Sequence, residues 1–108
     1  MFEVRHYVDH AGVDLFSEWL KKLRDPVAKV QVLKRVNRMG QGNFGDIDFC
    51  GEGVWEMRID VGPGYRVYYA RAALKMMLVL CGGDKRKQDA DIENAKEYWK
   101  DWQYRSDS

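Results

Sequence analysis

Residues 54–70 constrain the fold more than any other part of this chain. They read VWEMRIDVGPGYRVYYA, two runs in which apolar or aromatic residues alternate with polar ones, separated by a Gly-Pro-Gly tripeptide suited to a tight reversal. Alternation with a period of two is typical of a β-strand that buries one face. The segment therefore predicts a β-hairpin with an apolar face and a polar face: Trp55, Met57, Ile59, Tyr65, Val67 and Tyr69 against Glu56, Arg58, Asp60, Arg66 and Tyr68.

Further strands are expected on both sides of the hairpin. Residues 2–8 alternate in the same way, and residues 43–50 form a short or bulged strand. Residues 75–81 (KMMLVLC) are apolar at nearly every position, which predicts a central strand covered on both faces. Gly82 and Gly83 are expected to break this last strand, because glycine frees the backbone from strand geometry.

Three helices are predicted from capping residues and helical periodicity. Asp14 can cap the first, Asp25 and Pro26 open the second, and the closing helix is expected to be capped near Asp89 or Asp91. The expected inward stripes, taken in the same order, are Phe16, Trp19, Leu20 and Leu23; Val27, Val30, Leu33 and Val36; and Ile92, Ala95, Trp99 and Trp102.

Helices clustered early and strands clustered late predict an α+β domain. We expect a mostly antiparallel sheet of four to five strands, with an N-terminal helical hairpin on one face and a C-terminal helix. The 108 residues suit one domain, spanning residues 1–103, with a frayed tail at 104–108. The second face of the sheet is expected to be only partly covered, which would leave the polar residues of the hairpin in water.

The composition excludes several classes of protein. Eighteen lysines and arginines nearly balance seventeen aspartates and glutamates, and no recognition-helix pattern stands out, so a DNA-binding protein is disfavoured. Cys50 and Cys81 lack metal-site spacing and are expected to be reduced, as in a cytoplasmic protein. His6 and His10 are too few for a metal centre. No signal-peptide or membrane-span pattern is present, so we expect no membrane partner. We also expect no metal and no cofactor.

The polar face of the hairpin carries the candidate chemistry. Arg58 and Arg66, with Lys85 just beyond the glycine pair, could grip a phosphodiester and stabilise charge developing on phosphorus. Glu56, beside two arginines, suits a general base better than an acid, and Tyr68 is a weaker candidate for proton transfer or base stacking. A solvated sheet face followed by a solvated turn explains the same residues, and the pattern alone leaves both readings open.

Four blocks of the chain form a recognisable series: GNFGD (42–46), GVWEMRI (53–59), GPGYRVYYA (62–70) and LCGGDKRKQDADI (80–92). In this order they resemble the RelE/HigB-like superfamily, and more closely its phage-derived addiction module killer branch of type II toxins. The resemblance runs from the first strand to Trp102. It implies a microbial-ribonuclease-like fold and a metal-independent endoribonuclease that cuts mRNA on the ribosome and inhibits translation. It also implies a small antitoxin partner, often with a helix-turn-helix.

The resemblance also assigns roles. It implies that Arg66 and Lys85 handle the scissile phosphate, and Arg58 matches the arginine that ends the WExR strand. We expect Arg58 to position the backbone or Glu56. The expected reaction is attack of the ribose 2′-hydroxyl on phosphorus, giving a 2′,3′-cyclic phosphate and a 5′-hydroxyl end. Two basic stretches are candidates for contacts with RNA or the ribosome, although a solvated helix face is an equal alternative for the first. They are Lys21, Lys22, Arg24, Lys29, Lys34, Arg35 and Arg38, and then Arg86 and Lys87.

A second function remains open at this point. The chain has no histidine at the expected site and no tyrosine at the usual place in its C-terminal segment, where some relatives carry them. A non-catalytic module that contacts RNA or a repressor partner without cleavage would fit these departures.

Overall fold

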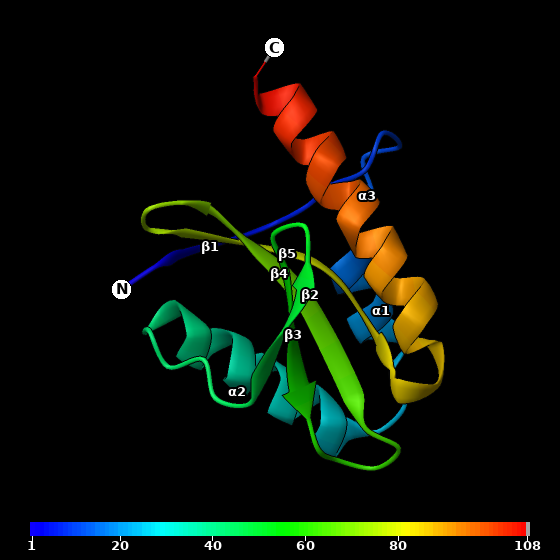
Figure 1. Ribbon diagram of the computed structural model, residues 1–108. Helices are drawn as coiled ribbons and strands as arrows, with labels where there is room; N and C mark the ends of the chain where they lie inside the picture. The colour runs from blue at the N-terminus through cyan, green and yellow to red at the C-terminus, as the bar shows by residue number, and fades with distance from the viewer. Residues whose placement is uncertain (108) are drawn as a thin grey trace.

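The computed structural model describes residues 1–107 and shows a five-stranded sheet with helices on both faces (Figure 1). The strand order is β1-β5-β4-β3-β2; β1 is parallel to β5 and the other pairs are antiparallel. The predicted α+β class is therefore confirmed. In chain order the elements are β1 (Glu3–His6), α1 (Leu15–Lys22), α2 (Pro26–Gly40), β2 (Ile47–Gly51), β3 (Val54–Ile59), β4 (Tyr65–Ala73), β5 (Met76–Asp84), the 3-10 turn η1 (Lys85–Lys87) and α3 (Gln88–Ser106).

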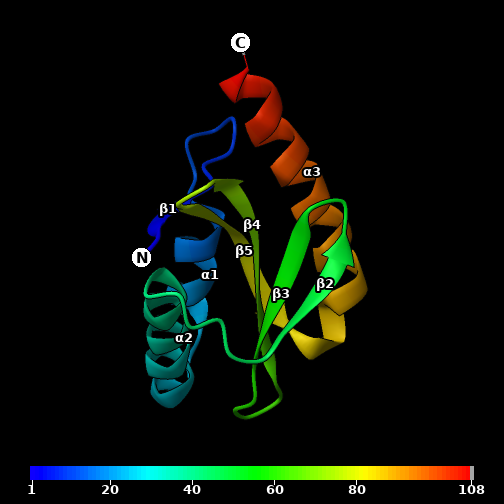
Figure 2. The ribbon, with the colours of Figure 1, turned by 60° about the vertical axis from the view of Figure 1, so that its left-hand side comes forward.

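The sheet separates two hydrophobic clusters. Helices α1 and α2 cover one face and α3 covers the other (Figure 2). The hairpin prediction is confirmed: Met57, Ile59 and Val67 pack on the α1–α2 side, whereas Val54 and Tyr68 pack on the α3 side. Alternation in β3 and β4 thus decides which residues meet which helical layer.

The two N-terminal helices begin where their capping residues predicted. The Asp14 carboxylate accepts a hydrogen bond from the Ser17 amide, and that of Asp25 accepts one from the Val27 amide. The buried stripe of α2, however, consists of Ala28, Val32, Val36 and Met39. Of the four residues expected to point inward, only Val36 does; Val27, Val30 and Leu33 are exposed.

Both stripes of α2 have helical spacing, so periodicity does not distinguish them. Ala28 offers a small side chain where the helix meets the sheet, and Arg35 anchors the same side. Its guanidinium donates to the carbonyl oxygens of Phe44 (3.2 Å), Asp46 (3.3 Å) and Arg58 (2.5 Å). These long-range contacts set the rotation of α2 and leave its bulkier apolar stripe in solvent.

Strand β5 continues through the glycine pair, and the prediction that Gly82 and Gly83 break it is wrong. Gly82 pairs with Val67 and Gly83 with Arg66, so both lie within the ladder. A methyl group added at Gly82 would overlap the indole of Trp19, and one at Gly83 would overlap the Asp91 carboxylate. The two glycines therefore allow close approach of a helix on each face of the strand.

Helix α3 closes the second face of the sheet, which the sequence analysis expected to be partly open. Ala95 and Trp99 pack into the cluster on that side, and Glu56, Arg66 and Tyr68 are buried beneath the helix. The expectation of a wet polar face is therefore wrong. No helix within residues 1–107 has the length and apolar character needed to cross a membrane.

The start and end of α3 also differ from expectation. Asp84 caps the preceding turn, since its carboxylate accepts from the Arg86 amide (2.9 Å), whereas Asp89 and Asp91 lie in the first turn of the helix. Residues 104–106 of the predicted tail are helical, and Arg105 donates to the carbonyl of Val8 (2.6 Å). The last residue of that tail, at position 108, lies outside the described residues.

Candidate functional site

The backbone positions of the three cations predicted to hold phosphate lie at one corner of the sheet. Arg58 and Arg66 stand directly opposite each other on β3 and β4, and their side chains leave the same face of the sheet. The amide of Lys85 donates to the carbonyl of Gly64 (3.0 Å), which places Lys85 beside the turn that precedes Arg66. The two strands of the hairpin and the more distant Lys85 thus meet at the end of the sheet where α3 begins.

Arg66 is engaged in a buried ion pair. Its Nε lies 2.8 Å from Oε2 of Glu56, and the two side chains are 11% and 4% exposed. The Nε–H is not aligned for a hydrogen bond with that oxygen, so the contact is an ion pair held by charge and proximity. The predicted base and the predicted phosphate ligand are therefore neighbours, but they face each other rather than solvent.

Gln88 completes this cluster, and the sequence analysis missed it. Its Nε2 donates to both oxygens of Glu56, at 2.9 Å and 3.1 Å. Gln88 is the first residue of α3, 32 positions from Glu56 in the sequence. Nothing local marks it, because its role depends on how α3 docks on the sheet. The amide and the Arg66 guanidinium thus contact the same carboxylate.

Arg58 lies at the outer edge of the same corner and is 35% exposed. Its guanidinium is 3.3 Å from the carboxylate of Asp46 and 3.9 Å from that of Asp48, both at the start of β2. Exposed pairs of this kind are weak and readily exchanged for another anion. Arg58 therefore remains more accessible to a phosphate than Arg66.

Two further titratable groups are enclosed near the pair. Tyr68 is fully buried, and its hydroxyl has no hydrogen-bond partner among residues 1–107. Burial, and then the charge of Glu56, raises the pKa of Tyr68, so this phenol keeps its proton. Burial also raises the pKa of Asp91, although Lys87 opposes the shift. The environment thus disfavours Tyr68 as a proton donor.

A pocket of about 420 Å³ opens outside this buried cluster. Lys85, Arg86 and Lys87 line it together with the first residues of α3. All three basic residues are exposed, and the adjacent helix start carries the positive end of the helix dipole, which favours anions. Gln88 lines the pocket and also binds Glu56, so it joins the solvent-accessible basic surface to the buried pair.

The basic stretch on the first two helices lies on the opposite face of the sheet from this pocket (Figure 2). Most of its residues are exposed, but Arg35 is half-buried and holds the segment before β2 as described above. Lys29 is also half-buried, and its ammonium donates to the carbonyl of Lys21 (3.3 Å). The exposed members are Lys21, Lys22, Arg24, Lys34 and Arg38.

Within the described chain, no group of three or more His, Cys, Asp or Glu side chains is arranged to hold a metal ion. Cys50 and Cys81 are free thiols. Burial and the nearby Glu56 carboxylate raise the pKa of Cys50 to about 11, so this cysteine is a poor nucleophile at neutral pH.

The fold and the site together define a small α+β protein with a basic corner at the start of its last helix. By comparison with known families, the chain belongs to the phage derived protein Gp49-like family (DUF891), whose model matches residues 18–100. An uncharacterized protein of Haemophilus influenzae is 47% identical over 81 residues, which cover 75% of this chain and 82% of the relative. The family match spans all five predicted catalytic residues. It agrees with the phage-derived origin that the resemblance implied, whereas membership of the wider RelE/HigB-like superfamily stays a prediction.

Proposed function

We propose that this protein is the toxin of a bacterial type II toxin–antitoxin module. In this proposal it is a cytoplasmic, metal-independent endoribonuclease that cuts mRNA on the translating ribosome and thereby inhibits translation. The observation that carries the proposal is the meeting of Arg58, Arg66 and Lys85 at one corner of the sheet, beside a basic pocket. Membership of a phage-derived family supports it, because addiction modules travel with phages.

The proposed reaction uses the 2′-hydroxyl of RNA as its nucleophile. The new bond joins the 2′-oxygen to phosphorus, the bond from phosphorus to the 5′-oxygen breaks, and Glu56 takes the proton of the 2′-hydroxyl. Lys85 and Arg66 stabilise the charge on the non-bridging oxygens, and Arg58 orients the backbone. A separate acid gives the departing 5′-oxygen its proton. The products are a 2′,3′-cyclic phosphate and a 5′-hydroxyl end.

This reaction requires the site to open locally. Glu56 is 4% exposed and held by Gln88, so the substrate must displace the Gln88 amide to reach the carboxylate. Gln88 lines the pocket in which the phosphate would bind, so a substrate in this pocket would meet the Gln88 amide. Tyr68, which keeps its proton and lies deeper, would pack the site rather than transfer protons.

The partners follow from the same proposal. They are mRNA and the ribosome as targets and a small antitoxin, of helix-turn-helix type, as the neutralising protein. The exposed residues of the basic stretch on α1 and α2 would contact ribosomal RNA, and Arg86 and Lys87 would contact the message.

A non-catalytic binding module is the second candidate, and one observation favours it. Both arginines already have carboxylate neighbours: Glu56 for Arg66, and Asp46 and Asp48 for Arg58. A site saturated in this way could bind a partner through its surface without cleaving RNA.

Induction in a bacterial host with mapping of mRNA 5′ ends distinguishes the two candidates. We expect growth arrest with new 5′-hydroxyl ends, reduced about a hundredfold or more in Lys85→Ala, because an exposed phosphate ligand is lost without harm to the core. Lys75→Ala changes another exposed lysine, in the turn before β5; it is the matched control and should cut like the wild type. Arrest without new ends would refute the nuclease and support the binding module.

A further inference from the structure

Helix α2 carries an apolar stripe that no part of the described chain covers. Val27, Val30 and Leu33 are 58%, 49% and 52% exposed. Their spacing of three residues makes them neighbours along the helix surface. Single exposed apolar residues are ordinary, but a contiguous row on one helix is typical of a protein-binding surface.

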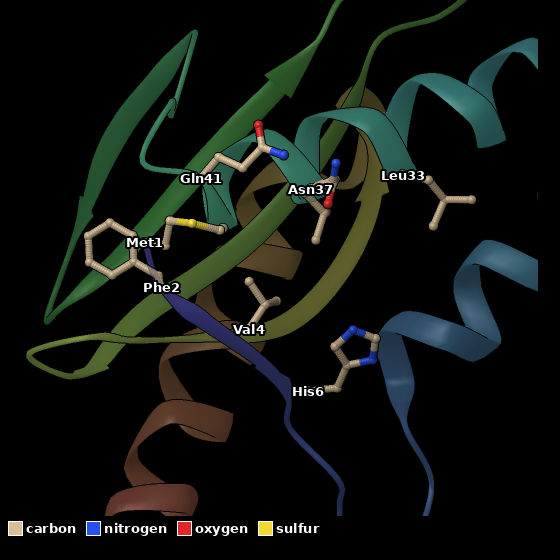
Figure 3. Close-up of a pocket in the computed structure, with 9 residues that line it drawn as sticks. Met1, Phe2, Val4, His6, Leu33, Asn37 and Gln41 are labelled. Atoms are coloured by element: carbon tan, nitrogen blue, oxygen red, sulfur yellow. The ribbon is translucent and has the colours of Figure 1, made fainter.

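Two hollows adjoin this stripe at Leu33, the member of the stripe that lines both of them. One, of about 450 Å³, lies between β1 and α2, with Val4 and His6 on one side and Leu33, Asn37 and Gln41 on the other (Figure 3). The second, of about 310 Å³, lies between α1 and α2 and is lined by Ser17, Leu20, Lys21, Lys29 and Leu33. Leu33 lines both hollows, so they meet at its side chain. We call this continuous surface the α2 groove.

The charges around the α2 groove are mostly positive. The nearest carboxylates already have partners: Glu18 is 3.8 Å from Lys21, Asp14 caps α1 and contacts His6, and Asp25 caps α2. The flanking cations are Lys21, Lys22, Arg24, Lys29 and Lys34. An apolar floor with basic flanks is complementary to an amphipathic helix that has an apolar ridge and acidic edges.

The apolar stripe favours a protein over RNA. Its basic flanks are also the residues proposed to contact ribosomal RNA, so the two partners would compete for this face. RNA recognition relies on cations and stacking aromatic rings, whereas the exposed stripe of α2 consists of valine and leucine side chains. Three valine and leucine side chains would be covered by a nucleic acid without a compensating contact.

We propose that the α2 groove is the docking site for an amphipathic helix of a protein partner, with leucine-like anchors at helical spacing and acidic residues on both sides. The groove lies on the α1–α2 face of the sheet, opposite the pocket at the start of α3 (Figure 2). A partner held only here leaves Lys85 accessible. Naming this partner as the antitoxin rests on the proposed function, but the docking site itself does not.

The test selects binders from a displayed library of 20-residue helical peptides with randomised surface positions. The full-length wild-type protein is the target, and Leu33→Asp is the counter-selection. We expect enriched peptides to carry leucine or isoleucine at positions i, i+3, i+4 and i+7 with aspartate or glutamate beside them. Leu33→Asp should weaken their binding about tenfold or more, because it places a carboxylate where the two hollows meet.

Matched variants make the result decisive. Leu74→Asp changes a 77% exposed leucine at the turn between β4 and β5 and should bind the peptides within about twofold of the wild type. Thermal unfolding of both variants checks that each is folded. Peptides that are basic, or that bind Leu33→Asp as tightly as the wild type, would overturn the proposal. Binding of a ribosomal RNA fragment that is lost in Leu33→Asp would overturn it as well.

The outcome is separable from that of the nuclease proposal. Lys85→Ala should bind the selected peptides like the wild type, since its side chain is on the other face. Peptide binding by a protein that makes no new RNA ends would support the docking site while refuting the nuclease. If the protein cleaves RNA but no acidic peptides can be selected, the nuclease would be supported and the docking site refuted.

Discussion

The two faces of the sheet are built by different rules. The face under α1 and α2 is apolar, and Met57, Val67 and Val79 belong to one hydrophobic cluster with residues of these helices. The face under α3 is apolar only toward Trp99; at the other end it encloses Glu56 and Arg66. Apolar packing tolerates small shifts, whereas a buried ion pair needs each partner in place. The first face therefore mainly stabilises the fold, and the second trades stability for a set of charges held in fixed positions.

Removing Arg66 should give the largest effect and test this contrast directly. Arg66→Ala leaves the Glu56 carboxylate buried without its counter-charge, so we expect the free energy of unfolding to fall by about 3–5 kcal/mol. Chemical denaturation at pH 7 measures it. A loss of activity in this variant would not by itself report on catalysis, which is why the exposed Lys85 is the better functional probe.

The matched control is an exposed ion pair elsewhere. Arg5 and Glu3 lie 2.6 Å apart on β1, with side chains 60% and 53% exposed, and Arg5→Ala should cost no more than about 1 kcal/mol. The double variant Glu56→Leu, Arg66→Met should recover most of the stability lost in Arg66→Ala, because no buried charge remains. If the double variant is as unstable as the single one, the pair is not the source of the loss.

The parts of this fold that depend on neighbouring residues were predictable from sequence. The Asp14 and Asp25 caps and the two faces of the hairpin follow from local chemistry and a period of two. Two features did not follow from local patterns: α3 covers the polar face, and α2 turns Leu33 outward. Both depend on contacts between distant segments, which no local pattern encodes.

The candidate site shows the same limit. The pairing of Glu56 with Arg66 was within reach, because both fall on the polar side of one hairpin. Gln88 was not, because only the docking of α3 brings its amide to Glu56. The catalytic roles of these residues stay predictions until the variants above are measured.

Gly82 and Gly83 are adjacent in β5 and approach helices on opposite faces of the sheet. Substituting each in turn therefore compares the two faces. We expect Gly82→Ala to destabilise the protein by about 1–3 kcal/mol, because the added methyl group overlaps the rigid indole of Trp19. Gly83→Ala should cost less, because the overlapping group is the end of the Asp91 side chain, which can rotate. Thermal unfolding of both variants under the same conditions shows which substitution destabilises the protein more. An equal or larger cost at Gly83 would mean that Asp91 is held as firmly as Trp19.

Asp91 gives the smallest expected effect, and its sign depends on pH. Burial raises the pKa of this carboxyl in the folded protein, so as the pH rises from below about 3.8 the unfolded chain ionises first and the fold loses stability. The loss of stability is complete once the pH exceeds the raised pKa. Asp91→Asn does not show this loss, because asparagine does not ionise. We therefore expect the free energy of unfolding of Asp91→Asn, relative to that of the wild type, to rise by less than about 1 kcal/mol between pH 3 and pH 7. Denaturation measured across this pH range checks it.

The control is Asp89→Asn, which changes an exposed residue in the same helical turn. It removes a favourable charge at the helix start and should be slightly less stable than the wild type at pH 7. A loss of stability in Asp91→Asn of the same size as in Asp89→Asn would show that the helix end and Lys87 outweigh burial, and that the α3 face accepts this charge without cost.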